Sequence, residues 1–312
     1  MVNITVIGSF VVGITVRVPR PPVIGEGLIG DLFDMGPGGK GTNQAVAASR
    51  LGARVHLVAC VGDDHLGRIA IDLYEREGIA LRDIHRISGV NTAVGCVTLL
   101  PTGENWIVGH LGANMHMCAG HVEAAEDKIA QSDIVLTQFE APIAAVSRAM
   151  ELGRQHGAMT IWNPAPAQPI WPDLLRHVDL ITPNETECRI LLGLPPDART
   201  PTPELARRLL GLGVKRVVVT IGKRGALIVT PDRFEHVPAP QIDALDPTGA
   251  GDAFNAALAV GLGEGLELRD AVERANYAGA YCCTRLGVVA GLLTKAELEA
   301  FMRSTGACAS PP

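Results

Sequence analysis

The amino-acid sequence predicts an α/β fold, a three-layer α/β/α sandwich with a mostly parallel central sheet and a small β-sheet lid. Short β-branched runs alternate with longer segments of helical period along most of the chain. Two segments break this alternation and have the composition of separate strands. Because strands of a parallel sheet are buried on both faces, the alternation implies that helices cover both sides of the sheet.

Six apolar runs have the length and β-branched content of buried strands. In chain order they are Ile4–Ile7, Val55–Val61, Ile134–Phe139, Thr160–Trp162, Leu180–Thr182 and Val217–Ile221. Helices are predicted between them, several ending at a glycine as helix C termini do. They are Thr42–Leu51, Leu66–Glu77, Ala141–Gln155, Glu204–Leu210, Ala253–Leu262 and Leu268–Arg285. The segment Val217–Val229 reads as two strands joined by a glycine-bounded turn.

The two interrupting segments predict the lid. Gly13–Met35 is rich in Val, Pro and Gly, and Val94–Leu100 with Asn105–Val108 reads as a hairpin around the turn Pro101–Glu104. We expect these lid segments, approximately 13–35 and 92–110, to cover the carboxyl ends of the parallel strands, where open α/β folds bind ligands. Because no repeat, charge block or linker divides the rest, we expect a single domain over 1–312.

Composition limits the possible functions. Of the 312 residues, 47% are hydrophobic, which excludes a disordered chain. The net charge of −6 does not favour a nucleic-acid partner. No apolar run approaches the roughly 18 residues of a membrane helix, and the N-terminus does not resemble a secretory signal. The seven cysteines form no CxxC pair, so neither a disulfide framework nor a zinc site follows. We expect a cytoplasmic protein.

The densest glycine cluster, Gly36–Gln44, leads directly into an Ala-rich helix. It is not a phosphate-binding Walker loop, because Asp34 and Gly41 stand where that motif needs Gly and Ser or Thr. It matches G-x-G-x-x-G, but the preceding Gly30–Met35 is a poor buried strand, which leaves a dinucleotide-dependent oxidoreductase as an alternative. The glycines either turn the chain, with Thr42 or Asn43 capping the helix, or let the backbone approach a ligand closely.

A second cluster, Asp246–Phe254, also leads into an Ala-rich helix. Small residues at Gly249, Ala250 and Gly251 leave free N–H groups at a helix N-terminus, which suits a phosphate or the charge of a moving phosphoryl group. Asp252 at the rim could accept the proton of an attacking hydroxyl. The alternative is that Asp252 is an acid favoured by the helix dipole.

Two further motifs follow predicted strands. In Thr182–Glu187, the pair Asn184 and Glu187 has the spacing of a capping box, and Glu187 could also hold the water shell of Mg²⁺ between nucleotide phosphates. In Gln138–Glu140, the carboxylate of Glu140 could accept hydrogen bonds from sugar hydroxyls. Both motifs fall at the same edge of the predicted sheet.

In this order, the motifs resemble the ribokinase-like (PfkB-type) carbohydrate kinase family over nearly the whole chain. Gly38–Ala45 is similar to its N-terminal signature and Asp246–Phe254 to its C-terminal one, which is highly specific. Asn163–Ala167 and Thr182–Glu187 are also similar to ribokinase. The resemblance implies a ribokinase-like fold, an ATP-dependent enzyme that uses Mg²⁺ and K⁺, and a lid that often pairs two subunits, here as a homodimer.

The resemblance also implies a role for each matching residue. Asp252 is the catalytic base, with Gly249, Ala250 and Gly251 as the anion hole. The sugar faces Gly39, Lys40, Gly41, Asn43 and Glu140. The nucleotide contacts Asn184, Thr220, Gly222, Gly225, Gly251 and Asn276, and Glu187 holds Mg²⁺ through water. The monovalent cation lies beside Asp246, Thr248, Cys282, Arg285, Gly287 and Gly291, several of them through backbone carbonyls.

One departure concerns the acceptor. Val11 and Gly13 stand where ribokinases carry Asn and Asp to bind the sugar hydroxyls. A ribose would leave hydroxyls unpaired, and each unpaired buried polar group costs about 1–3 kcal/mol. We therefore hypothesise a different or more apolar alcohol, another sugar or a nucleoside, whose bulk occupies the space left at Gly13.

The sequence thus predicts an ATP-dependent phosphotransferase that acts on a hydroxyl of a sugar or sugar-like alcohol. A nucleoside kinase of the same family is the alternative within this class. The alternatives outside the kinase class are a non-catalytic sugar-binding protein and the dinucleotide-dependent oxidoreductase.

Overall fold

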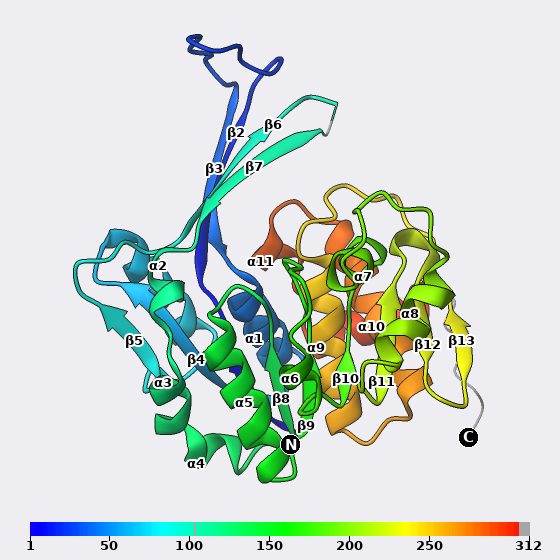
Figure 1. The fold of residues 1–312 in the computed structure, drawn as a ribbon. Helices are drawn as coiled ribbons and strands as arrows, with labels where there is room; N and C mark the ends of the chain where they lie inside the picture. The colour runs from blue at the N-terminus through cyan, green and yellow to red at the C-terminus, as the bar shows by residue number, and fades with distance from the viewer. Residues whose placement is uncertain (103, 306–312) are drawn as a thin grey trace.

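A nine-stranded sheet forms the centre of the protein, as seen in a computed structural model that describes residues 1–102 and 104–305 (Figure 1). Its order is β13-β12-β11-β10-β9-β8-β1-β4-β5; all pairs from β11 to β5 are parallel, and β12 and β13 are antiparallel. The strands are β1 (Asn3–Ile7), β4 (Arg54–Gly62), β5 (Ile84–Ile87), β8 (Ile134–Thr137), β9 (Met159–Trp162), β10 (Leu180–Ile181), β11 (Arg216–Thr220), β12 (Ala226–Val229) and β13 (Phe234–Val237). The predicted parallel sheet is confirmed.

Helices cover both faces of the sheet, because successive strand residues point to opposite sides. Val218 packs in one apolar core, while its neighbours Val217 and Val219 pack in the other. The first core contains residues of α1 (Lys40–Arg50), α2 (His65–Arg76), α9 (Ala250–Gly263), α10 (Leu268–Cys283) and α12 (Lys295–Ser304). The second contains residues of α3 (Ala119–Ala124), α4 (Glu126–Ile129), α5 (Ile143–Gln155), α6 (Pro172–Leu175), α7 (Glu185–Leu191) and α8 (Thr202–Leu210). The three-layer sandwich is therefore confirmed.

Several helix boundaries differ from the predicted ones, and the starts of three helices do so for local reasons. The helix expected from Ala141 begins at Ile143, because Pro142 takes an extended ψ of 138° at the N-cap. The helix expected from Ala253 begins three residues earlier, at Ala250, because Gly249 turns the chain with a φ of 84°. The helix α1 begins at Lys40 with Gly39 as its N-cap and no side-chain cap, so capping by Thr42 or Asn43 was wrong.

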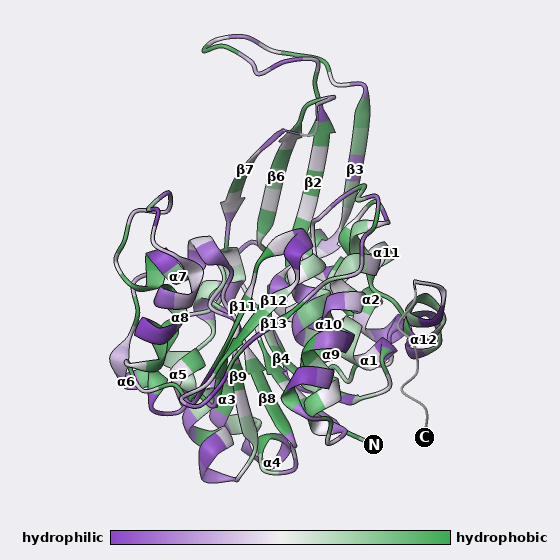
Figure 2. Cartoon of the chain, turned by 90° about the vertical axis from the view of Figure 1, so that its right-hand side faces the viewer, coloured by the Kyte–Doolittle hydropathy of each residue, from purple (hydrophilic) through white to green (hydrophobic). Residues whose placement is uncertain are grey.

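The lid is a separate four-stranded sheet in the order β3-β2-β6-β7. It consists of β2 (Val11–Arg17), β3 (Leu32–Gly38), β6 (Val94–Leu99) and β7 (Asn105–His110). Since β2 starts four residues after β1 ends, the lid rises from the carboxyl end of the central sheet (Figures 1 and 2). Gly30–Met35, a poor candidate for a buried strand, overlaps the exposed lid strand β3. Gly103, in the predicted turn Pro101–Glu104, lies outside the described residues.

Short helical turns complete the structure. They are η1 (Gly112–His116), η2 (Gly222–Arg224) and α11 (Val288–Gly291). Among the helices in the described part of the chain, none has the length and apolar character needed to cross a membrane.

Candidate active site

Buried polar side chains gather at the carboxyl ends of four adjacent parallel strands. Ser9 follows β1, Gln138 follows β8, Asn163 follows β9 and Thr182 follows β10. Parallel strands bring their carboxyl ends to one edge of a sheet, so these side chains share one region beneath the lid. Asp252, in the first turn of α9, contacts the same region.

The N-terminus of α9 presents backbone N–H groups to this region. Gly249 is its N-cap and provides no side-chain cap, while the N–H of Ala250 donates to Pro247 O at 3.2 Å. Within residues 1–102 and 104–305, the N–H groups of Gly251 and Asp252 find no acceptor. Free N–H groups in the first turn of a long helix attract an anion.

Gly249 and Gly251 are glycines for different reasons. A Cβ on Gly249 would lie 2.5 Å from Val288 Cγ1, and its φ of +84° disfavours any other residue. A Cβ on Gly251 would meet none of the described atoms within 4 Å, and its backbone φ is ordinary. The protein's own packing therefore requires glycine at 249 but not at 251.

The carboxylate of Asp252 is 6% exposed and is held by two amides of α1. Asn43 Nδ2 donates to Oδ2 at 2.8 Å, and Gln44 Nε2 donates to Oδ1 at 3.0 Å. Two neighbours orient Gln44. Gln138 Nε2 donates to Gln44 Oε1 at 2.6 Å, and Asn163 Oδ1 accepts from Gln44 Nε2 at 3.1 Å. The network presents an acceptor carboxylate in a fixed orientation.

Two glycines beside Lys40 let α1 pack closely on the chain between β1 and β2. A Cβ on Gly39, whose φ is +93°, would lie 2.8 Å from Val11 N. A Cβ on Gly41 would lie 2.3 Å from Ser9 N. Close packing within the chain is thus sufficient to explain these two glycines. It also brings the predicted residues Gly39, Lys40, Gly41 and Asn43 against the end of β1.

Glu140 joins the same region from the end of β8. One of its oxygens, Oε2, accepts the hydroxyl of Ser9 and the backbone N–H of Lys40, the latter at 2.8 Å. The predicted acceptor-side residues Lys40 and Glu140 are therefore brought together by the fold.

The charged side chains in this region shift one another's pKa values. Burial lowers the pKa of Lys40, but the carboxylates of Asp252, Glu140 and Glu187 outweigh it, so the pKa is raised and the ammonium is stabilised. Burial raises the pKa of Glu187, with a smaller contribution from the charge of Asp252; the Asn184 N–H and Lys40 oppose this. The ammonium of Lys40 therefore interacts with three carboxylates of the region.

The residues predicted to contact a nucleotide lie along the neighbouring strands. Thr220 ends β11 and forms an isolated bridge with Asn184, and Gly222 opens the turn to β12. Gly225 closes that turn with a φ of +99°, and a Cβ there would lie 2.2 Å from Val237 O, so packing against β13 requires this glycine. Asn276 of α10 is 5% exposed, and its Nδ2 donates to Val237 O at 3.0 Å.

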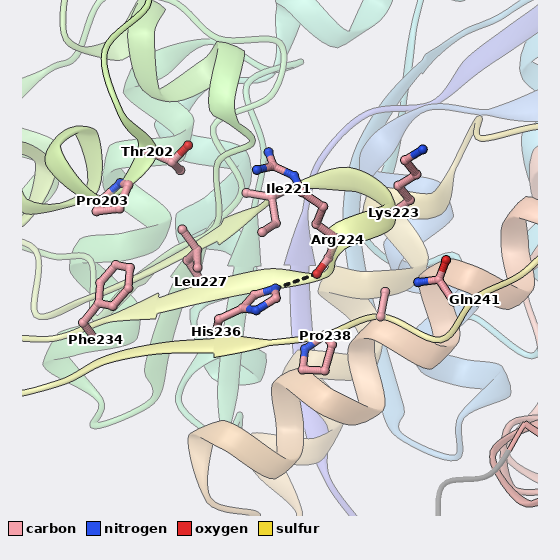
Figure 3. Close-up of a pocket in the computed structure, with 11 residues that line it drawn as sticks. Thr202, Pro203, Ile221, Lys223, Arg224, Leu227, Phe234, His236, Pro238 and Gln241 are labelled. Atoms are coloured by element: carbon pink, nitrogen blue, oxygen red, sulfur yellow. Dashed lines mark hydrogen bonds between the residues drawn. The ribbon is translucent and has the colours of Figure 1, made fainter.

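A hollow of about 620 Å³ lies behind this turn, between α8 and the strands β12 and β13 (Figure 3). Leu227, Phe234 and Pro238 line it, and His236 Nε2 bonds with the Arg224 carbonyl at 2.7 Å across one side. Its lining does not include Asp252 or the amides that bind it. The hollow instead adjoins the turn that carries Gly222 and Gly225.

The residues predicted to surround a monovalent cation come from the loop before α9, the C-terminal end of α10 and the segment that continues through α11. Asp246 Oδ1 accepts the Thr248 N–H at 2.9 Å and Oδ2 accepts the Gly287 N–H at 3.3 Å. Cys282 Sγ donates to Thr248 O at 3.5 Å, and a Cβ on Gly291 would lie 2.9 Å from that sulfur. Burial raises the pKa of Cys282 to about 12, so the thiol is uncharged. The Arg285 side chain instead bonds with Tyr281 Oη at 3.3 Å.

The family model that describes pfkB family carbohydrate kinases matches residues 1–295. The chain belongs to this carbohydrate kinase family. A ribokinase of Haemophilus influenzae is 33% identical over 300 residues, which cover 96% of this kinase and 98% of that protein.

Solved structures agree with this assignment. A Thermotoga maritima ribokinase has a TM-score of 0.88 and 32% identity, covering 97% of this kinase and 100% of that chain. An Arabidopsis thaliana ribokinase complexed with ribose and ATP has a TM-score of 0.89 and 26% identity, and the match covers 97% of this kinase and 99% of that chain. The ribokinase-like fold is thus confirmed.

Sequence reasoning missed several polar residues of the kinase. Gln44 and Asn163 complete the network around Asp252, and Asn255 anchors α9, since its Nδ2 donates to Gly251 O at 2.8 Å and its Oδ1 accepts the Thr182 hydroxyl. For Asn163, the available signal was its position directly after a predicted buried strand. For Gln44 and Asn255 the signal was a polar side chain inside an Ala-rich helix.

Proposed function

We propose that this kinase transfers the γ-phosphoryl group of ATP to a hydroxyl of a sugar or sugar-like alcohol, with Asp252 as the general base. The observation that carries this proposal is that one helix turn holds both the oriented Asp252 carboxylate and the unbonded N–H groups of Gly251 and Asp252. The carboxylate accepts the hydroxyl proton as the oxygen attacks phosphorus. The N–H groups, with Gly249 and Ala250 at the same helix end, stabilise the charge on the phosphoryl group.

The two substrates approach from opposite sides of Asp252. The acceptor lies against Gly39, Lys40, Gly41, Asn43 and Glu140, where Asn43 Oδ1 and one Glu140 oxygen remain to accept hydroxyls. The nucleotide lies along Asn184, Thr220, Gly222, Gly225 and Asn276, with its phosphates towards Gly251. Lys40, kept protonated by its neighbours, faces the anionic group between them.

Two cations support this arrangement. Glu187 uses one oxygen in its capping box, which leaves the other for the water shell of Mg²⁺ held by the phosphates. When bound, Mg²⁺ would neutralise part of the negative charge of the phosphates. K⁺ would be held by backbone carbonyls around Asp246, Thr248, Cys282, Arg285, Gly287 and Gly291. The carboxylate of Asp246 and the uncharged thiol of Cys282 suit a monovalent cation.

The proposed function is tested by ADP formation with ATP, Mg²⁺ and K⁺ on a panel of sugars and glycosides. We expect acceptor-dependent ADP release, reduced when K⁺ is replaced by a larger organic cation. Binding of acceptors without any ADP release would instead support a non-catalytic sugar-binding protein. Unchanged rates without K⁺ would contradict the proposed K⁺ site but leave the proposed kinase activity standing.

We expect Glu187→Gln to raise the Mg²⁺ concentration needed for half-maximal activity by about tenfold. The Asn184 N–H donates to Glu187 Oε2 at 2.8 Å, and a glutamine oxygen accepts the same bond, so the helix cap is kept while the charge is lost. Because burial raises the pKa of Glu187, its carboxylate becomes protonated on acidification at a higher pH than an ordinary glutamate. The wild-type enzyme should therefore lose its Mg²⁺ response at that higher pH, and the variant should show no such pH-dependent loss. Activity is measured in Mg²⁺ titrations at several pH values.

A matched control exists in α12. Glu297 occupies the same capping-box position and accepts the Thr294 N–H at 2.8 Å. Glu297→Gln should leave the Mg²⁺ requirement unchanged. If Glu187→Gln behaves like this control, Glu187 has no role in binding Mg²⁺.

We also propose a homodimer that forms through the lid, with residues 1–312 as one domain. Register places Phe33, Met35, Trp106 and Val108 on one face of the lid, and they are 46–74% exposed. Exposed apolar clusters of this kind support burial against another protein surface.

We expect the chain to elute as a dimer in size-exclusion chromatography with light scattering, and Phe33→Asp with Trp106→Asp to make it monomeric. Buried unpaired carboxylates are strongly unfavourable, so the double variant removes the interface without changing the central sheet. Leu212→Asp, on an exposed apolar residue of the body, is the control. A monomeric wild-type chain would contradict the proposal.

A further inference from the structure

Four glycines form one continuous row across the lid. Gly13 of β2 pairs with Gly36 of β3 and with Gly95 of β6, and Gly95 pairs with Gly109 of β7. This glycine row crosses the sheet from edge to edge, so the lid has a strip without side chains.

Nothing in the described part of the chain requires glycine at these positions. None of the four has a positive φ, so other residues could adopt the same backbone. An added Cβ would meet nothing within 4 Å at Gly36, and its nearest neighbours would lie at 3.8 Å at Gly13, 3.7 Å at Gly95 and 3.5 Å at Gly109, which are ordinary contacts. Because glycine weakens a strand, a row of four indicates that the space is kept for something outside the chain.

The strip opens towards Asp252. Val11 pairs with Gly38 and lies two residues before Gly13, so their Cβ positions share one face of the lid. A Cβ on Gly38 would lie 4.0 Å from Asn43 Oδ1, and the same Asn43 side chain donates to Asp252. Asn43 is 5% exposed, and its Oδ1 has no partner among the residues that the structure describes. An unpartnered buried oxygen aimed at this face of the lid awaits a donor such as an acceptor hydroxyl.

The dimensions and rim of the strip indicate its occupant. Four strands at their usual spacing give a floor about 14 Å long, and the nearest side-chain rows lie about 7 Å away on either side. Those rows carry Val11 on one side and Thr15, Val97 and Ile107 on the other, with Asp34 at the far edge. A flat floor whose neighbouring side chains are uncharged except for Asp34 at the far edge fits a planar ring, and it is much longer than a pentose alone.

We propose that the glycine row binds a flat ring carried by the acceptor sugar, so that the acceptor is a glycoside whose anomeric substituent is planar, as in a nucleoside. The inference rests on the proposed function, because the phosphorylated hydroxyl lies at Asp252 and the ring extends from the other end of the sugar. Val11 and Gly13 agree with it, since neither side chain can bond a free hydroxyl there. The ring is either a nucleobase or an aromatic aglycone.

The test compares ribose, methyl riboside, phenyl riboside and inosine as acceptors, with kcat/KM measured by ADP release. We expect inosine to exceed ribose and methyl riboside by about tenfold or more, as burial of a ring supplies. If kcat/KM for phenyl riboside equals that for inosine, any flat ring is sufficient. If only inosine shows the increase, the site is selective for a nucleobase. Gly13→Val and Gly109→Val should each lower the ratio of inosine to ribose kcat/KM by about tenfold, because the added side chains fill the strip.

Gly27→Val is the matched control. Gly27 lies in the loop between β2 and β3 with an ordinary φ and open space around its Cβ position, so the ratio should not change. ADP release with ribose that equals or exceeds that with both ring-bearing acceptors overturns the inference and leaves the proposed function standing. No ADP with any acceptor overturns the proposed function. In that case calorimetry decides the inference: inosine binding that Gly13→Val abolishes and Gly27→Val retains supports the ring site, and no binding overturns it.

Discussion

Asp252→Asn is expected to lower kcat by about 10²- to 10⁴-fold, because an amide cannot take the proton of the attacking hydroxyl. The affinity for ATP should stay unchanged, since the N–H groups at the start of α9 do not depend on this side chain. The variant keeps an oxygen that can accept from Asn43 or Gln44, and the lost bond costs about 1–3 kcal/mol of folding stability. Steady-state kinetics, ATP calorimetry and thermal unfolding measure the three effects separately.

Asp72→Asn provides the control for this change. Asp72 lies on α2 and forms an exposed pair with Arg68 at 3.1 Å, so its loss should not alter kcat. If Asp252→Asn keeps a turnover close to that of this control, Asp252 is not the base.

Gly251→Ala is expected to lower kcat about 10²-fold while the protein becomes no less stable. The Cβ of a helical residue tilts towards the helix N-terminus, which here is the space proposed for the phosphoryl group. That position is open in the protein itself, with nothing within 4 Å, and replacing glycine in a helix favours folding by about 0.5–1 kcal/mol. Thermal unfolding and kinetics on the same preparation would show an enzyme that is fully folded but turns over about 10²-fold more slowly.

Gly120→Ala is closely matched to this variant. Gly120 is the second residue of α3, as Gly251 is of α9, and both follow an alanine and are exposed. It should leave kcat unchanged and, like Gly251→Ala, make the protein no less stable. Full activity of Gly251→Ala would show that no reacting group approaches this turn.

Local sequence patterns were sufficient for the central sheet and for the polar strand ends. Apolar runs such as Val217–Ile221 are buried on both faces, and burial of that kind is readable from composition alone. The short strands β5 and β13 were not predicted, because four residues with polar members carry too little pattern. The glycine row was also invisible, since it depends on register between four strands.

The site itself divides in the same way. Asp252 and the Gly249–Gly251 turn could be placed from motif chemistry at a helix start. The amide donors Asn43 and Gln44 could not be assigned to Asp252 from sequence, because the bonds join residues 209 and 208 positions apart. Only the packing of α1 against α9 determines that pairing.

This long-range pairing has a consequence for synthesis of the chain. Chains emerge from the ribosome N-terminus first, so Asn43 and Gln44 are exposed long before Asp252 has been made. Until α9 packs, their amides have water as a partner and no carboxylate can act as a base. A truncated or incompletely translated product therefore lacks the reaction centre however well its first half folds, and activity reports on the completion of the whole polypeptide.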